Sequence, residues 1–202
     1  MIFVILLRYN LQTIMNTKQR CGWCEGDDLY EAYHDTEWGV PVYDDGTLFE
    51  FLILETFQAG LSWITVLRKR ENFRKAFDNF NYKKIANYKQ GKIDSLLQDA
   101  GIIRNKLKVK ATVTNAQAFI KIQEEFGSFS NYIWRFVDGK PIKNKLKDYQ
   151  NAPANTPVSD TISKDLKIRG FKFVGSTVIY AHMQATGMVN DHETSCFRYN
   201  EV

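Results

Sequence analysis

The 202-residue chain is 44% hydrophobic and carries 27 Lys and Arg residues against 23 Asp and Glu, giving a formal net charge of +4. This length and apolar content suffice for a single domain of two packed lobes and exclude a disordered protein. The mildly basic charge allows a polyanionic partner without requiring one. Three cysteines, a small and odd number, argue against a secreted disulfide scaffold, so we expect a reducing, cytoplasmic compartment.

The chain opens on an apolar run over residues 1–7, far shorter than the roughly 20 residues that span a bilayer. Neither a preceding positive charge nor a following small-residue cleavage site marks it as a secretory signal. Met15, followed by polar residues, is a second candidate start. We therefore expect residues 1–14 to be a mis-assigned start or a dispensable tail. We expect residues 15–202 to form the domain, with no membrane as a partner.

Cysteines and histidines at both ends of the chain have spacings typical of zinc sites. Cys21 and Cys24 precede His34, and His192 lies four residues before Cys196, which places two ligands on one helical face or around one turn. One thiolate of the first pair with the other three residues makes a closed N2S2 set, the type that holds structural rather than catalytic zinc. From spacing alone, unconnected small or polar residues are an equal alternative.

An acidic residue stands at an unusual place in the next predicted element. Residues 47–59 have the dense apolar content of a buried helix, and Glu55 continues it. Because carboxylates are seldom buried without a partner, Glu55 is expected to face a local partner or a pocket. In the first case it accepts from backbone N–H groups or caps the helix that begins near Ser62. In the second it accepts from a ligand, while rings such as Trp63 pack on that ligand's face.

Aromatic residues are concentrated upstream of this helix, over residues 15–42. At this density they pack a core or line a pocket for a flat ligand, and the first use is the commoner. The stretch includes Trp23, Tyr30, Tyr33 and Trp38.

Further helices are predicted over residues 62–77 with a break near Glu71, and over residues 82–89, 93–100 and 105–126. Ser130 is expected to cap a helix through Phe136, and Ser159 to begin one that ends before Gly170. Residues 138–157 have the composition of a connection or lid. Residues 171–179 alternate like a strand, but one strand has no partner. His182 lies in an apolar run and is expected to be a core or groove histidine. We predict an all-α fold.

A short turn over residues 98–106 joins two of these helices and contains Gly101. A glycine where the first helix ends lets a phosphate approach the N–H groups that open the second, and nearby lysines add charge. The turn is therefore a candidate binding site for a nucleic-acid backbone, one that does not depend on the base sequence. A plain helix–helix turn with a solvated basic face is an equal alternative. The candidate DNA contacts are Gly101, Ile102, Arg104 and Lys106.

Several longer motifs occur in a fixed order, and together they resemble the DNA-3-methyladenine glycosylase I family from about Cys21 to Cys196. They are Cys21-Gly22-Trp23 and the runs over residues 33–41 (YHDTEWGVP), 58–67 (QAGLSWITVL), 99–104 (DAGIIR), 169–175 (RGFKFVG) and 190–192 (NDH). Two features depart from the family pattern. Cys24 adds a competing thiol, and residues 1–14 have no counterpart.

The resemblance implies a helix-hairpin-helix glycosylase fold whose two ends are joined by a structural zinc. It implies that Cys21, His34, His192 and Cys196 hold the zinc. It also implies a base pocket containing Tyr33, Trp38, Glu55 and Trp63.

The activity implied is hydrolysis of the N-glycosidic bond of 3-methyladenine, flipped out of double-stranded alkylated DNA by a monomeric enzyme. Methylation at N3 makes the base positive and weakens its bond to the sugar, so no strong general acid is required. Glu55 would accept from the exocyclic amine and act as the catalytic, electrostatic residue. The loop from Gln58 through Gly60 to Leu61 would probe the lesion. No Asp or Glu occurs between Asp99 and Glu124, which favours a monofunctional enzyme without strand cleavage.

Two other classes of protein stay open at this point. A zinc-stabilised DNA-binding module without catalysis would keep the hairpin and metal residues but has no need of a carboxylate beside pocket aromatics. A thiol oxidoreductase would need Cys21 and Cys24 both free, although no strand precedes them as such a motif requires.

Overall fold

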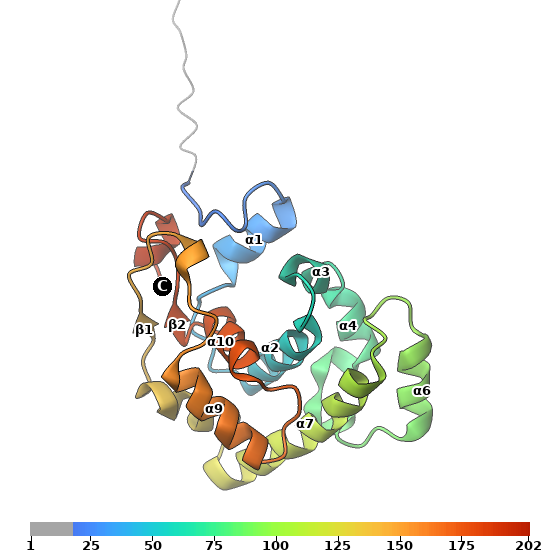
Figure 1. Ribbon diagram of the computed structural model, residues 1–202. Helices are drawn as coiled ribbons and strands as arrows, with labels where there is room; N and C mark the ends of the chain where they lie inside the picture. The colour runs from blue at the N-terminus through green and yellow to red at the C-terminus, as the bar shows by residue number, and fades with distance from the viewer. Residues whose placement is uncertain (1–17) are drawn as a thin grey trace, which may run out of the picture.

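The structure, a computed structural model, describes residues 18–202, and the expected tail over residues 1–14 lies outside the described residues. Helices make up most of this part of the chain (Figure 1). They are α1 (Asp28–Thr36), α2 (Asp45–Gln58), α3 (Trp63–Leu67), α4 (Arg70–Ala76), α5 (Tyr82–Ile85), α6 (Gln90–Gln98), α7 (Lys106–Phe126), α8 (Phe129–Trp134), α9 (Pro157–Ile168) and α10 (Ser176–Ala185).

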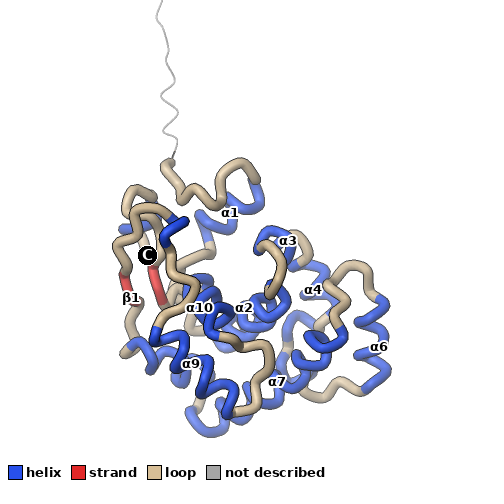
Figure 2. Tube along the Cα trace, viewed as in Figure 1, coloured by secondary structure: helices blue, strands red, loops and turns tan. Residues whose placement is uncertain are grey.

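The all-α prediction is confirmed for the helical architecture, to which the described residues add two short strands, β1 (Ile142–Lys143) and β2 (Val189–Asn190), which pair in parallel. They lie beside each other near the C-terminus (Figure 2). Sequence periodicity could not reveal them, because each strand has only two residues and its partner lies more than 40 residues away. No helix in the part of the chain that the structure describes is long and apolar enough to cross a membrane.

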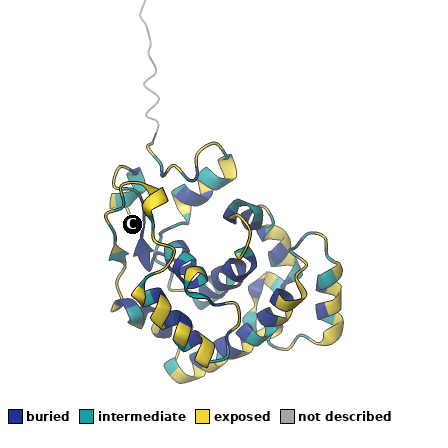
Figure 3. Cartoon of the chain, viewed as in Figure 1, coloured by how far each residue is buried: buried dark blue, intermediate teal, exposed yellow. Residues whose placement is uncertain are grey.

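Helix α2 forms the centre of the fold and contacts α3, α7, α8 and α10. From Leu48 to Phe57 every residue is buried apart from Glu50, which is half-buried. Figure 3 shows α2 as a mostly buried helix surrounded by helices with exposed outer faces. A helix that is apolar all round must be covered on every side, which accounts for this central position. Asp44 caps its start by accepting from Thr47 N at 2.7 Å.

Several predicted boundaries are wrong by a few residues because local caps decide them. The helix expected over residues 62–77 is divided at Arg68 and Lys69 into α3 and α4, and the one expected over 82–89 ends at Ile85. Ser128, not Ser130, caps α8. Pro157 begins α9, because Thr156 and Ser159 form a reciprocal capping box.

Two helices were missed. Helix α1, capped by Asp27, lies in the aromatic-rich stretch, and α10 begins inside the run over residues 171–179 that was expected to alternate like a strand. A short apolar run does not distinguish a strand from a buried helix. The amide of Asn115 donates to Lys172 O and accepts from Lys172 N, fixing the turn that precedes α10.

The start and the end of the described chain meet at the C-terminal end of α10. Gly39 N and Val42 N donate to the carbonyls of Gln184 and Thr186. Gly187, at φ +68°, lies so close to this segment that a Cβ atom would stand 2.4 Å from the Val40 carbonyl carbon. Only glycine fits there, and the absence of a side chain allows residues 21–42 to lie against residues 184–196.

Candidate functional site

A cavity of about 200 Å³ opens between α1, α2, α3, α10 and the segment that follows β1. It brings together the four residues that the family resemblance implies for a base pocket, together with Gln58. Its lining comprises Trp23, Tyr30, Tyr33, Trp38, Glu55, Gln58, Trp63, Leu146, Tyr149, Ala152, Ala181, Gln184 and Asp191. The segment over residues 138–157, expected to be a connection or lid, thus supplies part of the cavity wall.

Glu55 is the unusual group in this cavity. Its side chain is 3% exposed, and its Oε2 atom has no hydrogen-bond partner among the described residues. The alternative in which Glu55 caps the helix near Ser62 is not found, since no N–H at the start of α3 donates to Glu55 among the described residues. Burial raises the pKa of Glu55 to about 8. The cavity therefore holds a carboxyl group that has an unused acceptor atom and ionises less readily than an ordinary glutamate.

Aromatic rings enclose the space beside this acid. Tyr33 and Trp63 lie with ring centroids 5.6 Å apart, and Trp23 lies 4.9 Å from Trp38 and 4.7 Å from Tyr30. The Nε1 atom of Trp63 is also buried without a partner among the described residues. Aromatic faces carry negative quadrupole density, so rings arranged around an acid favour a flat, cationic ligand.

A second acid, Asp191, also lines the cavity and was not singled out by sequence reasoning. It accepts from Asn144 Nδ2 at 2.6 Å, Tyr180 Oη at 2.7 Å and Gln184 Nε2 at 2.8 Å. Three donors satisfy this carboxylate, in contrast to Glu55. The only sequence signal was its place in the run over residues 190–192, next to His192. Its donors come from two distant segments, the residues after β1 and helix α10.

The four residues proposed as metal ligands come together, so the alternative of unconnected residues is wrong. Cys21, His34, His192 and Cys196 are all buried, with one donor atom of each lying within 4.8 Å of the others. His34 Nε2 lies 3.4 Å from Cys196 Sγ, and His192 Nδ1 lies 3.6 Å from both sulfurs. This buried Cys2His2 cluster could hold a metal ion.

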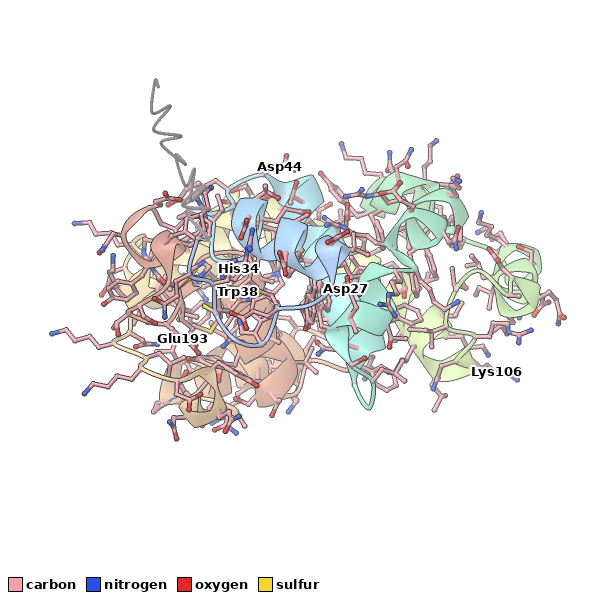
Figure 4. All side chains as sticks on the ribbon, turned by 90° about the horizontal axis from the view of Figure 1, so that it is seen from above. Asp27, His34, Trp38, Asp44, Lys106 and Glu193 are labelled. Carbon is pink, nitrogen blue, oxygen red and sulfur yellow. The ribbon has the colours of Figure 1, made fainter. Side chains whose placement is uncertain are left out.

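The surroundings of the cluster fit a metal. His34 Nδ1 lies 2.8 Å from Asp35 Oδ1, and His192 Nε2 lies 3.1 Å from the carbonyl of Trp38, so each histidine turns its other nitrogen towards the sulfurs. The hydrogen bond between the two thiols lowers the pKa of Cys196 and raises that of Cys21, so it favours a thiolate, the form that binds metals, at Cys196 alone. Figure 4 shows His34 and Trp38 side by side, where the cluster adjoins the cavity.

Cys24, the extra thiol, is buried but is not one of the four clustered residues. Its Sγ atom donates to the carbonyl of Cys21 at 3.1 Å, so it is engaged by the backbone. His182 is also buried, with Nε2 3.1 Å from Leu48 O, and burial lowers its pKa to about 4. It is a neutral core histidine.

The predicted hairpin lies between α6 and α7, away from the cavity. Asp99 Oδ1 accepts from Gly101 N at 2.7 Å, and a Cβ atom on Gly101 would lie 2.9 Å from that oxygen. The expectation of free N–H groups at the start of α7 needs correction, because Asn105 accepts from Leu107 N and Lys108 N. Arg104 and Lys106 are exposed on this turn, whereas Ile102 is buried.

Lys108 links the hairpin to the cavity. Its buried ammonium group donates to the carbonyls of Phe57 at 2.9 Å and Ala59 at 2.8 Å, at the C-terminal end of α2. The loop that follows turns at Gly60, where φ is +86°, and exposes 43% of Leu61. The first turn of α7 thus holds the loop that leads from Glu55 to Trp63.

Comparison with known proteins identifies the family. Residues 23–199 match the family model described as methyladenine glycosylase. The chain is 48% identical over 181 residues to DNA-3-methyladenine glycosylase 1 of Escherichia coli (strain K12), covering 90% of this chain and 97% of that protein. It is also 48% identical over 177 residues to DNA-3-methyladenine glycosylase of Haemophilus influenzae, covering 88% and 96%.

Solved structures agree with this result. The crystal structure of a 3-methyladenine DNA glycosylase I superposes with a TM-score of 0.86 at 50% identity, covering 89% of this chain and 98% of that one. The enzyme from Staphylococcus aureus, solved to explain its recognition of 3-methyladenine, gives a TM-score of 0.85 at 36% identity and covers 88% and 95%. The chain therefore belongs to the methyladenine glycosylase family.

Proposed function

We propose that the protein is a base-excision-repair glycosylase that hydrolyses the N-glycosidic bond of 3-methyladenine in alkylated DNA. The observation that carries the proposal is the buried Glu55 carboxyl group, which has an unused acceptor atom inside an aromatic cavity. The names of the relatives at 48% identity support the same activity.

The raised pKa of Glu55 supplies a basis for selecting the damaged base. With a pKa of about 8, Glu55 is mostly protonated at neutral pH while the cavity is empty. A cationic base lowers that pKa by direct charge interaction, so Glu55 ionises and accepts from the exocyclic amine. Ordinary adenine is neutral, so it does not lower the pKa of Glu55 in this way. The ring faces of Tyr33, Trp38 and Trp63 add stacking of roughly 1–3 kcal/mol per base.

Bond cleavage then needs little further machinery. The electron pair of the glycosidic bond leaves with the base, which loses its positive charge, while charge develops on the sugar. The ionised Glu55 acts electrostatically, with no proton donated to the base. A water molecule adds its hydroxyl to the sugar carbon and releases a proton. Since the sequence has no acid between Asp99 and Glu124, we propose a monofunctional reaction without strand cleavage.

We propose that Zn²⁺ is the metal of the Cys2His2 cluster and that its role is structural. Cys21, His34, His192 and Cys196 would occupy all four tetrahedral positions, leaving none for water. The bound ion would fasten α1 to the C-terminal segment. Through His192, which contacts the Trp38 carbonyl and follows Asp191, it would also fix one wall of the cavity.

For the substrate, we propose duplex DNA with the damaged nucleotide flipped into a cavity between two packed helical lobes of a monomer. The turn over residues 99–105 would act as the hairpin of a helix-hairpin-helix motif. Gly101, Ile102, Arg104 and Lys106 would meet the backbone, and the loop of Gln58 and Gly60 would probe the lesion. The compartment would be the one that holds the DNA, which in a bacterium is the cytoplasm.

Release of free 3-methyladenine from methylated duplex DNA tests the proposal. We expect release by the unmodified protein, a large loss in Glu55→Gln, and no change in Glu124→Gln, an exposed glutamate on α7. If the variant at Glu55 releases the base at the unmodified rate while remaining folded, the role of Glu55 is wrong. If the unmodified protein binds DNA but releases no base, the non-catalytic DNA-binding module is favoured instead.

A further inference from the structure

Residues 140–147 carry four lysines and no acidic residue, a local charge of +4 in a chain whose formal net charge is also +4. The segment includes β1 and runs on into the cavity wall. Exposure alternates along it. The even-numbered residues Ile142, Asn144 and Leu146 are half-buried, while the odd-numbered lysines are exposed at 143, 145 and 147.

Backbone hydrogen bonds attach this segment to residues 188–194, although the regular strand covers only Ile142–Lys143 and the chain bends at Lys147. Ile142 N donates to Met188 O at 2.9 Å, Asn144 N to Asn190 O at 3.1 Å, and Leu146 O accepts from Thr194 N at 2.7 Å. Where such a chain is extended, alternate side chains lie on one face, roughly 7 Å apart, and the alternating exposure places the three lysines on the outer face. The three lysines therefore form an ordered row, which we call the lysine row: Lys143, Lys145 and Lys147.

The charges of the lysine row are available for an external partner. None of the three forms an ion pair with any residue over the described range 18–202. Lys143 lies over the Tyr199 ring at 4.3 Å, a contact that leaves its charge uncompensated. The adjacent acid, Asp148, accepts from Gln150 N and so caps the following turn.

The row lies at the edge of the cavity, on the side away from the hairpin. Leu146, between Lys145 and Lys147, lines the cavity. Tyr149 lines it too, and its N–H donates to Glu193. Figure 1 shows β1 and the α6–α7 hairpin on opposite sides of the molecule. In Figure 4, Trp38 lies between Glu193, beside the end of the row, and Lys106, beside the hairpin.

We propose that Lys143, Lys145 and Lys147 bind the phosphodiester backbone of the DNA that delivers its base to the cavity, opposite the hairpin. A flipped nucleotide stays joined to its backbone, so phosphates must pass the rim of the cavity on both sides. A rigid row of uncompensated lysines beside that rim attracts them independently of base sequence. The inference rests on the proposed glycosylase function.

A second explanation is that the lysines protect a strand edge. Charged side chains, especially lysine, keep exposed strands from pairing with other molecules. This explanation predicts that the protein self-associates when the lysines are removed. It also predicts that DNA binding weakens only as much as it does when any three other exposed lysines are removed. The two explanations therefore separate in a measurement of salt-dependent affinity.

The experiment compares the full chain with two triple variants of equal charge. One is Lys143→Gln, Lys145→Gln, Lys147→Gln; the control is Lys83→Gln, Lys84→Gln, Lys121→Gln, exposed lysines that do not line the cavity. Affinity for a duplex with a central tetrahydrofuran abasic analogue is measured by fluorescence anisotropy at several salt concentrations. Each phosphate contact adds about 0.9 to the slope of log K against log salt. We expect the row variant to lose about 2 to 3 from this slope relative to the control.

Equal slopes in the two triple variants would overturn the proposal, and equal slopes with increased light scattering by the row variant would establish edge protection. Two further measurements separate this failure from others. Binding of free 3-methyladenine, followed by tryptophan fluorescence, reports on the cavity and is expected to be unchanged in the row variant. Base release by the unmodified protein tests the glycosylase function itself, whatever the salt slopes show.

Discussion

Replacing Glu55 by glutamine is expected to stabilise the protein at alkaline pH while abolishing its proposed activity. Burial raises the pKa of Glu55 from 4.5 to about 8. A shift of one unit corresponds to about 1.4 kcal/mol, so the ionised form in the empty cavity costs on the order of 5 kcal/mol. The low exposure of this side chain, 3%, agrees with such a cost.

The sign of the pH dependence follows from proton linkage. Between pH 4.5 and 8 the folded protein keeps a proton on Glu55 that the unfolded chain releases. This contribution to stability is complete below pH 4.5 and is lost as the pH rises through 8. Glutamine has no proton to lose, so the variant and the unmodified protein should have nearly equal free energies of unfolding at pH 4.5. Near pH 8.5 the variant should be more stable by several kcal/mol.

Urea unfolding at steps from pH 4.5 to 8.5 provides the assay. Glu124→Gln, which removes the same charge from an exposed site on α7, is the matched control and should follow the unmodified protein throughout. A difference that stays constant across this range would refute the argument, because it would mean that Glu55 titrates normally. Glu55 would then be ionised in the empty cavity at neutral pH, and its protonation could not discriminate a cationic base from a neutral one.

Three further changes test the framework around the site. Gly187→Ala should lower the free energy of unfolding by about 2–5 kcal/mol, because alanine is strained in the left-handed backbone and its Cβ would clash with Val40. The control, Gly91→Ala, has open space around it in α6 and should be neutral or stabilising. Lys108→Met should leave two carbonyls unpaired, lower the urea midpoint and slow base release, with Lys110→Met as the exposed control. Removal of the metal by a chelator should lower the melting temperature and expose residues near α1 to proteolysis; an unchanged melting temperature would contradict the structural zinc.

The sequence was most informative where a long pattern or a cap dominates the local structure. Helix α7 begins and ends as expected over residues 105–126, because Asn105 caps it and Gly127 ends it at φ +81°. The density of apolar residues around Glu55 predicted a buried α2. The order of the family motifs predicted that the cavity aromatics gather around Glu55 and that the metal residues meet from opposite ends of the chain.

Other features depend on contacts between distant segments, which local patterns do not contain. Asp191 follows β2, whose pairing with β1 brings Asn144 to it, while α10 supplies the donors Tyr180 and Gln184. The lysine row gains its order from hydrogen bonds to residues 188–194, more than 40 positions away. Helix α10 was obscured because its first residues share an apolar run with the turn before it.

The most direct test of the central claim is a crystal structure of the protein with 3-methyladenine bound. We expect the base inside the cavity, with its exocyclic amine about 2.8–3.2 Å from a Glu55 carboxylate oxygen and its ring against Trp63 or Tyr33. A base bound at another site, or bound in the cavity without contact to Glu55, would contradict the claim.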